Sequence, residues 1–342
     1  MGMCKVISYA DILIGLQAGD EGKGKVAHHL LKSGDYNLVL RYNGGSNAGH
    51  TVYHNGQKIV THQVPMGALF GIPSVIGMGC VVNIPELVKE IRMLKSLGFY
   101  TEGMIMVDKR AHVVTDAHIQ ADSNESKIGT TRQGIGPAYT DKYSRKGTRI
   151  GDMDLSSIID FSVCDIFDVF HGKVSKKILC EGAQGWQIDI DWGDYPYVTS
   201  SHCTVGSVCL NGIPPQNIRK IIGTMKAYET YSGFKTHFMD DTDKDLKRLQ
   251  VAGNEFGATT GRARKTRWLG LDEVIRAIRV NGVTDVIINK VDVLEQVNVF
   301  KVFSNGQLYT LSDINEFKFF VEARAKTFHV NNIIWSSTPN GI

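Results

Sequence analysis

The stretch "GLQAGDEGKGKVAHHLL", residues 15–31, decides the fold of this chain. It starts inside the apolar run 11–17 and leads into residues with helical spacing, so it predicts a strand, a glycine-rich loop and a helix in that order. Gly19 to Lys25 fits the pattern G-x-x-x-x-G-K, in which backbone N–H groups and the helix N-terminus bind phosphate. That pattern continues with a Ser or Thr that holds magnesium, but this chain has Val26. We therefore predict a nucleotide-binding loop whose metal is held by another residue.

Two carboxylates in the same loop, Asp20 and Glu21, are unusual because they repel phosphate unless a metal or a proton transfer requires them. One of them could replace the missing hydroxyl group as a metal ligand, or could act as a base. Lys23 and Lys25 add positive charge to the loop. The loop thus combines a predicted phosphate site with a group that can accept a proton or hold a cation.

Hydrophobic patterning predicts the rest of the fold. We expect strands at 37–42, 74–79, 177–182, 221–230 and 285–292, a hairpin at 51–60 with a turn at Asn55-Gly56, and helices at 85–98, 272–282 and 314–328. Strands that alternate with helices predict an α/β fold with a mostly parallel central sheet, helices on both faces and a P-loop-like site. Without repeats or linkers, residues 1–342 are predicted to form a single domain, in which the long glycine-rich stretches at 129–147, 182–206 and 253–268 are functional loops.

Composition excludes several classes of protein. Lys and Arg number 38 and Asp and Glu 35, and the net charge of +3 is too small to indicate a nucleic acid or a membrane surface as partner. The six cysteines form no C-x-x-C pair, so we expect reduced thiols in a cytoplasmic protein. We expect neither a signal peptide nor a transmembrane helix, since no stretch reaches about 18 apolar residues.

Further loops carry side chains that suit anionic ligands. In "NAGHT", Asn47 can hydrogen-bond a substrate and His50 can offer a hydrogen bond or charge to phosphate near neutral pH. Residues 128–139 offer Gly, Thr and Arg, and residues 141–149 are strongly basic. The stretch 256–268 places four cations among small hydroxyl residues, and Arg binds carboxylate and phosphate with two parallel hydrogen bonds.

The tetrapeptide "NKVD", residues 289–292, follows the apolar run "DVII". In GTP-binding proteins, N-K-x-D at the end of a strand reads guanine, because its carboxylate accepts hydrogen bonds from two donors on the guanine edge. Four residues occur easily by chance. A buried strand before them and a phosphate loop elsewhere in the chain favour guanine recognition.

Taken together, seven segments closely resemble the adenylosuccinate synthetase family, and they come in the order of that family: "GDEGKGK", "NAGHT", "IGTTRQGIGPAY", "EGAQG", "YPYVTSS", "GNEFGATTGRARK" and "NKVD". The resemblance implies a GTP-dependent ligase that joins IMP and L-aspartate into adenylosuccinate, GDP and phosphate, the first committed step of AMP synthesis from IMP. It also implies Mg²⁺, a homodimer and a 6-phosphoryl-IMP intermediate, which makes the oxygen on C6 a better leaving group.

The same resemblance implies roles for individual residues. Asp20 is the base that removes the N1 proton of IMP and is a magnesium ligand with the backbone oxygen of Gly49, while His50 stabilises charge on the departing GDP. The implied IMP-binding residues are Asp20, Lys23, Asn47, Ala48, Gly49, His50, Thr131, Arg145, Gln184, Thr199 and Arg262, with Arg145 supplied to the neighbouring subunit. The implied aspartate-binding residues are Ala258, Thr259, Thr260, Gly261, Arg262, Ala263 and Arg264. The implied GTP-binding residues are Gly19, Glu21, Gly22, Lys23, Gly24, Lys25, Gly49, Thr51, Arg264, Lys290, Val291, Asp292, Ser336 and Ser337.

Two other functions compete with this interpretation. A GTP-dependent small-molecule kinase or GTPase would explain the phosphate loop and "NKVD", but not Asp20, His50 and the arginine-rich loop together. A non-catalytic guanine-nucleotide sensor is disfavoured by the presence of both Asp20 and His50. A requirement for IMP and aspartate in GTP turnover separates the three functions.

Overall fold

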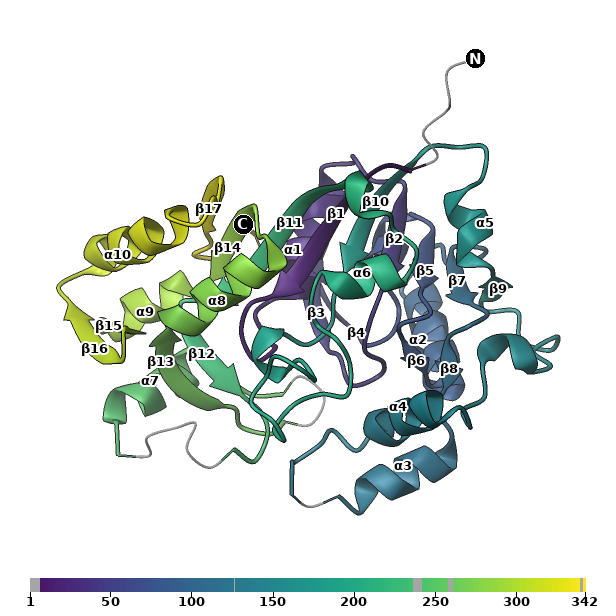
Figure 1. Ribbon diagram of the computed structural model, residues 1–342, viewed down its shortest axis with the longest axis horizontal. Helices are drawn as coiled ribbons and strands as arrows, with labels where there is room; N and C mark the ends of the chain where they lie inside the picture. The colour runs from purple at the N-terminus through teal and green to yellow at the C-terminus, as the bar shows by residue number, and fades with distance from the viewer. Residues whose placement is uncertain (1–6, 126, 236–241, 258–260, 339–340) are drawn as a thin grey trace.

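A computed structural model describes residues 7–125, 127–235, 242–257, 261–338 and 341–342. Its centre is a nine-stranded sheet of order β17-β14-β11-β1-β10-β2-β5-β7-β9, in which all neighbouring strands run parallel (Figure 1). The strands are β1 (Ile7–Gly15), β2 (Leu38–Arg41), β5 (Ser74–Ile76), β7 (Ile105–Asp108), β9 (Ser162–Cys164), β10 (Lys176–Glu181), β11 (Ile218–Lys226), β14 (Asp285–Asn289) and β17 (Asn332–Trp335). The predicted α/β class with a mostly parallel sheet is confirmed.

Both faces of this sheet are buried. Along β1, Ile12 and Ile14 belong to one hydrophobic core, whereas Leu13 between them belongs to the other. Because alternate residues of a strand point to opposite faces, helices must cover both sides. The first core takes residues from α5 to α10, and the second from α1 and α2. The helices are α1 (Lys23–Lys32), α2 (Ile84–Ser96), α3 (Asp116–Ser123), α4 (Ile135–Ser144), α5 (Ile166–Phe170), α6 (Gly206–Leu210), α7 (Lys244–Ala252), α8 (Leu271–Asn281), α9 (Val291–Val297) and α10 (Ile314–Lys326).

Three smaller sheets lie beside the central sheet among the described residues. A four-stranded sheet of order β12-β13-β15-β16 lies at the side of β14 and β17 (Figure 1). A hairpin, β3 with β4, and a parallel pair, β6 with β8, complete the described strands. These strands are β3 (His50–His54), β4 (Gln57–Thr61), β6 (Val81–Val82), β8 (His112–Val113), β12 (Tyr228–Tyr231), β13 (Lys265–Gly270), β15 (Phe300–Ser304) and β16 (Gln307–Leu311), and short 3₁₀ helices occupy Met66–Phe70, Ile150–Asp152, Trp186–Ile188 and Pro215–Asn217.

Most predicted elements are confirmed, and four are corrected. The strand predicted at 285–292 ends at Asn289, because α9 begins at Val291, and the predicted loops 129–147 and 253–268 contain α4 and the start of β13. The hairpin turns at Asn55-Gly56, where both residues have positive φ as a type I′ turn requires. The predicted strand 221–230 is wrong in its extent, since it is two strands in different sheets. The backbone N–H of Ala227 still bonds Asn289 of β14, and β12 then turns away to pair antiparallel with β13. A continuous β-type sequence pattern does not reveal this change of partner.

The sheet gathers the predicted loops at one edge. Parallel strands end on the same side, and ligands of open α/β sheets bind outside the carboxyl ends of the strands. The loops that begin after β1, β2 and β10 contain glycine-rich segments, and "NKVD" begins at the last residue of β14. Within the described residues, every helix is too short or too polar to span a membrane.

Candidate active site

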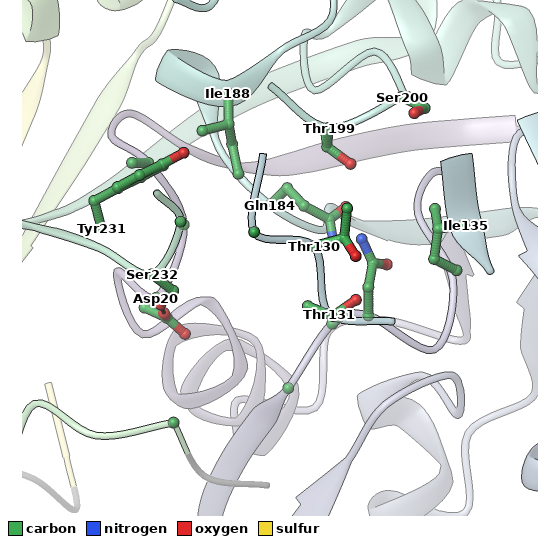
Figure 2. A pocket seen from close by; sticks show the side chains of 18 of the residues that line it. Asp20, Thr130, Thr131, Ile135, Gln184, Ile188, Thr199, Ser200, Tyr231 and Ser232 are labelled. Carbon is green, nitrogen blue, oxygen red and sulfur yellow. Dashed lines mark hydrogen bonds between the residues drawn. The ribbon is translucent and has the colours of Figure 1, made fainter. Parts of the chain in front are cut away.

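A cavity of about 1330 Å³ opens where these loops meet. It is lined by 17 of the predicted site residues: Gly19, Asp20, Glu21, Gly22, Lys23, Gly24, Asn47, Ala48, Gly49, His50, Thr51, Thr131, Gln184, Thr199, Arg264, Lys290 and Asp292. In the sequence these residues span most of the chain, and the fold brings them around one space. Figure 2 shows Asp20 on one side of that space and Thr131, Gln184 and Thr199 on the other.

The glycine-rich loop is held from within by Glu21. This carboxylate is buried and accepts hydrogen bonds from the backbone N–H of Gly19 (2.9 Å) and of Gln17 (3.2 Å) and from Lys23 Nζ (2.5 Å). A Cβ atom on Gly15 or Gly185 would lie 2.6 or 2.4 Å from its oxygens, so glycine is needed at both positions. In the structure Glu21 therefore supports the loop and neutralises Lys23.

Asn289, the first residue of "NKVD", joins this loop to β14. Its Nδ2 donates to the backbone oxygen of Glu21 (2.7 Å) and to Thr224 Oγ1 (3.1 Å). A Cβ on Gly22 would lie 3.1 Å from the same nitrogen. The motif therefore fixes the glycine-rich loop relative to α9, whose first turn carries Asp292.

His50 stands at the start of β3 against the first turn of α1, where a Cβ on Gly24 would lie 2.8 Å from the Cβ of His50. Its Nδ1 is 2.5 Å from Glu181 Oε1, and the same oxygen is 2.9 Å from Arg41 Nη1. The backbone N–H of Met66 donates to the other oxygen of Glu181 (2.8 Å). The side chains of His50, Glu181 and Arg41 are all buried.

Electrostatics fix the proton on this histidine. Burial and the neighbouring Arg41 lower the pKa of His50, although Glu181 opposes them. Burial would raise the pKa of Glu181, but His50 and Arg41 hold it below its usual range. An ionised carboxylate only accepts hydrogen bonds, so the Nδ1 of a neutral His50 carries the proton and Nε2 is left for a ligand.

Asp20 occupies a left-handed backbone conformation (φ 61°), which presents its side chain at the cavity. Its Oδ2 lies 2.8 Å from Arg264 Nε and accepts a long hydrogen bond of 3.4 Å from Ser232 Oγ. Figure 2 shows Ser232 beside Asp20, with Tyr231 next along the wall of the cavity. Asp20 thus places a carboxyl group at the cavity surface, with one oxygen beside Arg264 and Ser232.

Cations and polar groups gather on the "NKVD" side. Lys290 and Asp292 line the cavity, and Lys290 Nζ donates to the backbone oxygen of Gly253 (2.8 Å). Lys25 does not line it but donates to Ser336 Oγ (2.8 Å), and burial lowers the pKa of Lys25 to about 8. Val291 is buried in the hydrophobic core, and neither Ser336 nor the exposed Ser337 is among the residues that line the cavity.

The remaining predicted residues lie around the rim or outside. Arg262 stacks on Phe234, 4.6 Å from the ring centroid, and its Nη1 is 3.4 Å from the backbone oxygen of Gly129. Arg145 ends α4 with φ 65° and is exposed, outside the cavity lining. Gly261 and Ala263 are exposed and also outside the lining, while the predicted Ala258, Thr259 and Thr260 lie outside the described residues.

Sequence reasoning missed several residues of the site. Ile188, Ser200, Tyr231 and Ser232 line the cavity, as Figure 2 shows, and Glu181 contacts His50. The charge of Glu181 at the end of the apolar strand "KILCEG" was a signal, since a buried carboxylate needs a partner. The apolar and hydroxyl residues gave no signal of their own.

A possible metal-ligand group lies near the cavity but has another explanation. Ligand atoms of Asp189, Asp191 and His202 lie within 4.8 Å of one another. Asp189 already accepts hydrogen bonds from the backbone N–H groups of Asp191, Trp192 and Cys203. Asp189 therefore serves to hold its loop.

Comparison with known proteins decides the family. A family model described as adenylosuccinate synthetase matches residues 12–160 and 153–330. The chain belongs to the adenylosuccinate synthetase family. An adenylosuccinate synthetase of Chlorobium limicola is 37% identical over 87% of this chain and 80% of its own length, and one of Helicobacter acinonychis is 37% identical over 86% and 81%.

Solved structures agree with this membership. Fully ligated adenylosuccinate synthetase from Plasmodium falciparum superimposes with a TM-score of 0.84 at 26% identity, over 97% of this chain and 98% of that chain. Succinoaminodeoxyadenylate synthetase of cyanophage S-2L, bound to dGMP and dATP as an energy donor, shares the fold with a TM-score of 0.76 at 19% identity, over 98% and 94%. As an adenylosuccinate synthetase family member, the chain is a purine-biosynthetic ligase that joins IMP and L-aspartate at the expense of GTP.

Proposed function

We propose that the cavity binds IMP, GTP and L-aspartate together, and that Asp20 and His50 act directly in the reaction. The observation that carries the proposal is the place of Asp20, a carboxylate in the phosphate loop with Oδ2 held by Arg264. Across the cavity stand the polar side chains of Gln184, Thr199 and Thr131 (Figure 2). A purine between these two walls would present its six-membered ring to the carboxylate and to the phosphate loop at once.

In the first step Asp20 takes the proton from N1 of IMP, and negative charge develops on O6. That oxygen attacks the γ-phosphorus of GTP, so an O6–P bond forms while the bond from the γ-phosphorus to the bridging oxygen breaks and GDP leaves. A positioned base of this kind contributes roughly 10²–10⁴-fold to the rate. Backbone N–H groups of Asp20 to Gly24 and the N-terminus of α1 would stabilise the phosphates.

His50 would stabilise charge on the departing GDP. With Nδ1–H directed to Glu181, Nε2 donates a hydrogen bond only after the ring takes a second proton. The negative charges of Glu181 and of the phosphates favour that protonated form, against the effects of burial and of Arg41. We assign Glu181 the task of holding His50 in this orientation.

In the second step the amine of aspartate attacks C6, the C6–O6 bond breaks, and phosphate leaves with O6 and takes up the proton that the amine loses. The segment 258–264 would hold the aspartate carboxylates, and the cavity-lining position of Arg264 supports this. Lys23, Asn47, Ala48, Gly49, Thr131, Gln184, Thr199 and Arg262 would bind IMP. Gly22, Gly24, Lys25, Gly49, Thr51, Arg264, Lys290, Asp292 and the backbone of Val291 would bind GTP, with Ser336 and Ser337 near the guanine.

We propose that Asp20 and the backbone oxygen of Gly49 hold Mg²⁺, with the remaining ligands from phosphate and water. A carboxylate and a backbone carbonyl are hard oxygen donors of the kind this ion prefers, and both residues line the cavity. When bound, Mg²⁺ neutralises charge on the transferring phosphoryl group.

The quaternary and cellular setting is also proposed. A homodimer in which Arg145 binds the IMP phosphate of the partner subunit is supported by the exposure of Arg145 and its place outside its own cavity lining. One domain over residues 1–342 is supported by a core that includes residues of both larger sheets, such as Ile12 and Trp268. The five described cysteines are free, which suits the cytoplasm.

The direct experiment follows GTP turnover by the purified protein with IMP and aspartate supplied together or singly. GDP and adenylosuccinate should form in equal amounts, and adenylosuccinate only when both substrates are present. GTP hydrolysis that is indifferent to IMP and aspartate would contradict the proposal and favour a GTPase.

A further inference from the structure

Glu255 is a buried carboxylate outside the cavity lining, and it contacts Arg264, which in turn contacts Asp20. Glu255, between α7 and β13, has no exposed surface. Both of its carboxylate oxygens accept hydrogen bonds from Lys226 Nζ at 2.8 Å. In addition, Oε1 accepts one from the hydroxyl group of Tyr228 (2.7 Å), and Oε2 accepts one from Arg264 Nη1 (2.9 Å). None of the proposed substrates would touch Glu255, so its influence on them must pass through Arg264.

Glu255 fixes Arg264 by its backbone as well as by its side chain. The N–H of Arg264 donates to the backbone oxygen of Glu255 (2.9 Å), and Gln250 Nε2 donates to the backbone oxygen of Arg264 (2.5 Å). The guanidinium then reaches into the cavity with Nε 2.8 Å from Asp20 Oδ2. A flexible arginine side chain is thereby restricted at both ends, which reduces the entropy lost when it binds a ligand.

Charges alternate along this chain of contacts: Lys226, Glu255, Arg264 and Asp20. Burial would raise the pKa of Glu255, but the positive charges of Lys226 and Arg264 lower this pKa to about 2. Glu255 is therefore ionised at neutral pH and compensates the fully buried Lys226 as well as Arg264. The turn before Glu255 also accepts a hydrogen bond from Lys290 at the backbone oxygen of Gly253 (2.8 Å).

We propose that Glu255 is a positioning residue, which holds Arg264 in the orientation that receives aspartate and GTP. The inference rests on the proposed role of Arg264 at those two substrates. Lys226 and Tyr228 hold Glu255 in turn, since both contact it and neither lines the cavity. The binding of IMP, which we assign mainly to other residues, does not depend on Glu255.

The test compares KM values in two variants. Glu255→Gln keeps the shape of the side chain and removes its charge, and the KM for aspartate and GTP should rise about tenfold, the order that one charge-assisted hydrogen bond supports, with the KM for IMP unchanged. Tyr228→Phe removes one hydrogen bond to Glu255 and should fold normally; both KM values should rise by a smaller factor in the same pattern. Unchanged KM values for aspartate and GTP in Tyr228→Phe and in any folded Glu255 variant would overturn the proposal.

A matched control separates positioning from a merely structural role. Glu229 of β12 is equally buried and pairs with Arg267, which does not line the cavity. Glu229→Gln should lower stability without changing either KM. The double variant Lys226→Met with Glu255→Gln removes both charges of the buried pair. Its stability should therefore be higher than that of Glu255→Gln alone, while its KM for aspartate should stay high. Recovery of both properties would show that Glu255 only supports the fold.

Failure of the positioning role is distinguishable from failure of the proposed role of Arg264. Arg264→Leu should raise both KM values more than Glu255→Gln does. If Arg264→Leu leaves them unchanged, Arg264 does not bind those substrates. If Arg264→Leu raises them and Glu255→Gln and Tyr228→Phe do not, Glu255 does not position Arg264.

Discussion

Replacing Glu181 with glutamine removes a buried negative charge that contacts both His50 and Arg41. Arg41 is only 2% exposed, so the variant leaves a guanidinium in the core without its ion-pair partner. Breaking a buried pair in this way costs about 3–5 kcal/mol. Glutamine keeps one acceptor oxygen, so we expect a loss near the lower end, about 3 kcal/mol, from a total stability on the order of 5–15 kcal/mol.

We expect Glu181→Gln to lower kcat as well, independently of its effect on stability. Without the charge of Glu181, the protonated form of His50 loses the anion that favours it, and its stabilisation of the departing GDP weakens. A loss of roughly a hundredfold in kcat is expected, the lower end of what a positioned acid contributes. The assays are urea unfolding followed by circular dichroism, and steady-state GTP turnover with IMP and aspartate.

Glu90→Gln is the matched control. Glu90 is buried and accepts hydrogen bonds from the backbone N–H groups of His62, Gln63 and Val64 at 2.8 to 3.1 Å, so its three donors are backbone groups and none is His50. It should lose about 1–3 kcal/mol for a mismatched buried hydrogen bond and keep its kcat. A Glu181→Gln variant with wild-type kcat, or a Glu90→Gln variant with the same loss of kcat, would refute the reasoning about His50.

The same pair predicts a dependence on pH. The pKa of Glu181 is lowered in the folded protein, so its stabilisation is complete above the unfolded value of about 4.3 and is lost as the pH falls below it. The difference in unfolding free energy between wild type and Glu181→Gln should therefore be largest near neutral pH and shrink in acid. A difference that grows on acidification would contradict the ion pair.

Three further predictions test other parts of the site. Asp292→Asn should weaken GTP and improve XTP, by about ten- to a hundredfold in relative KM, because xanthine offers an acceptor where guanine has its amino group; an unchanged preference would exclude base reading by "NKVD". Mixing inactive Arg145→Leu with inactive Asp20→Ala should restore activity toward roughly a quarter of wild type, since about half the dimers are mixed and each has one intact site; exchange of subunits without recovery would place Arg145 in its own site or none. Gly24→Ala puts a Cβ 2.8 Å from that of His50 and should cost about 1–3 kcal/mol in urea unfolding as well as kcat, so a variant with wild-type values would show that the contact relaxes freely.

The sequence was sufficient for the parts of the site that are local. Glycines, a lysine and a carboxylate within seven residues predicted the loop, and the structure places Asp20 at a cavity with Gly19 to Gly24. The order of strands and helices predicted a parallel sheet because βαβ connections favour it. "NKVD" after an apolar run predicted a strand end, which β14 confirms.

Contacts between distant segments could not be predicted in the same way. Glu181 meets His50 and Glu255 meets Arg264 only after folding, and each carboxylate stands in the sequence as one charge among many. Nor does the pattern of 221–230 show that β11 and β12 join different sheets, since both are β-type and buried. The proposed role of Arg145 in a partner's site depends on a second chain, which no pattern within one chain specifies.

Positional isotope exchange in labelled GTP tests the central claim most directly, namely that Asp20 removes the N1 proton so that O6 can be phosphorylated. With IMP present and aspartate absent, reversible transfer of the γ-phosphoryl group lets the bridging oxygen of GTP exchange with the other oxygens of the β-phosphate. The account predicts exchange in the wild type only when IMP is added, and a rate lower by roughly 10²–10⁴-fold in Asp20→Asn. Exchange in Asp20→Asn at the wild-type rate, or exchange in the wild type without IMP, would contradict it.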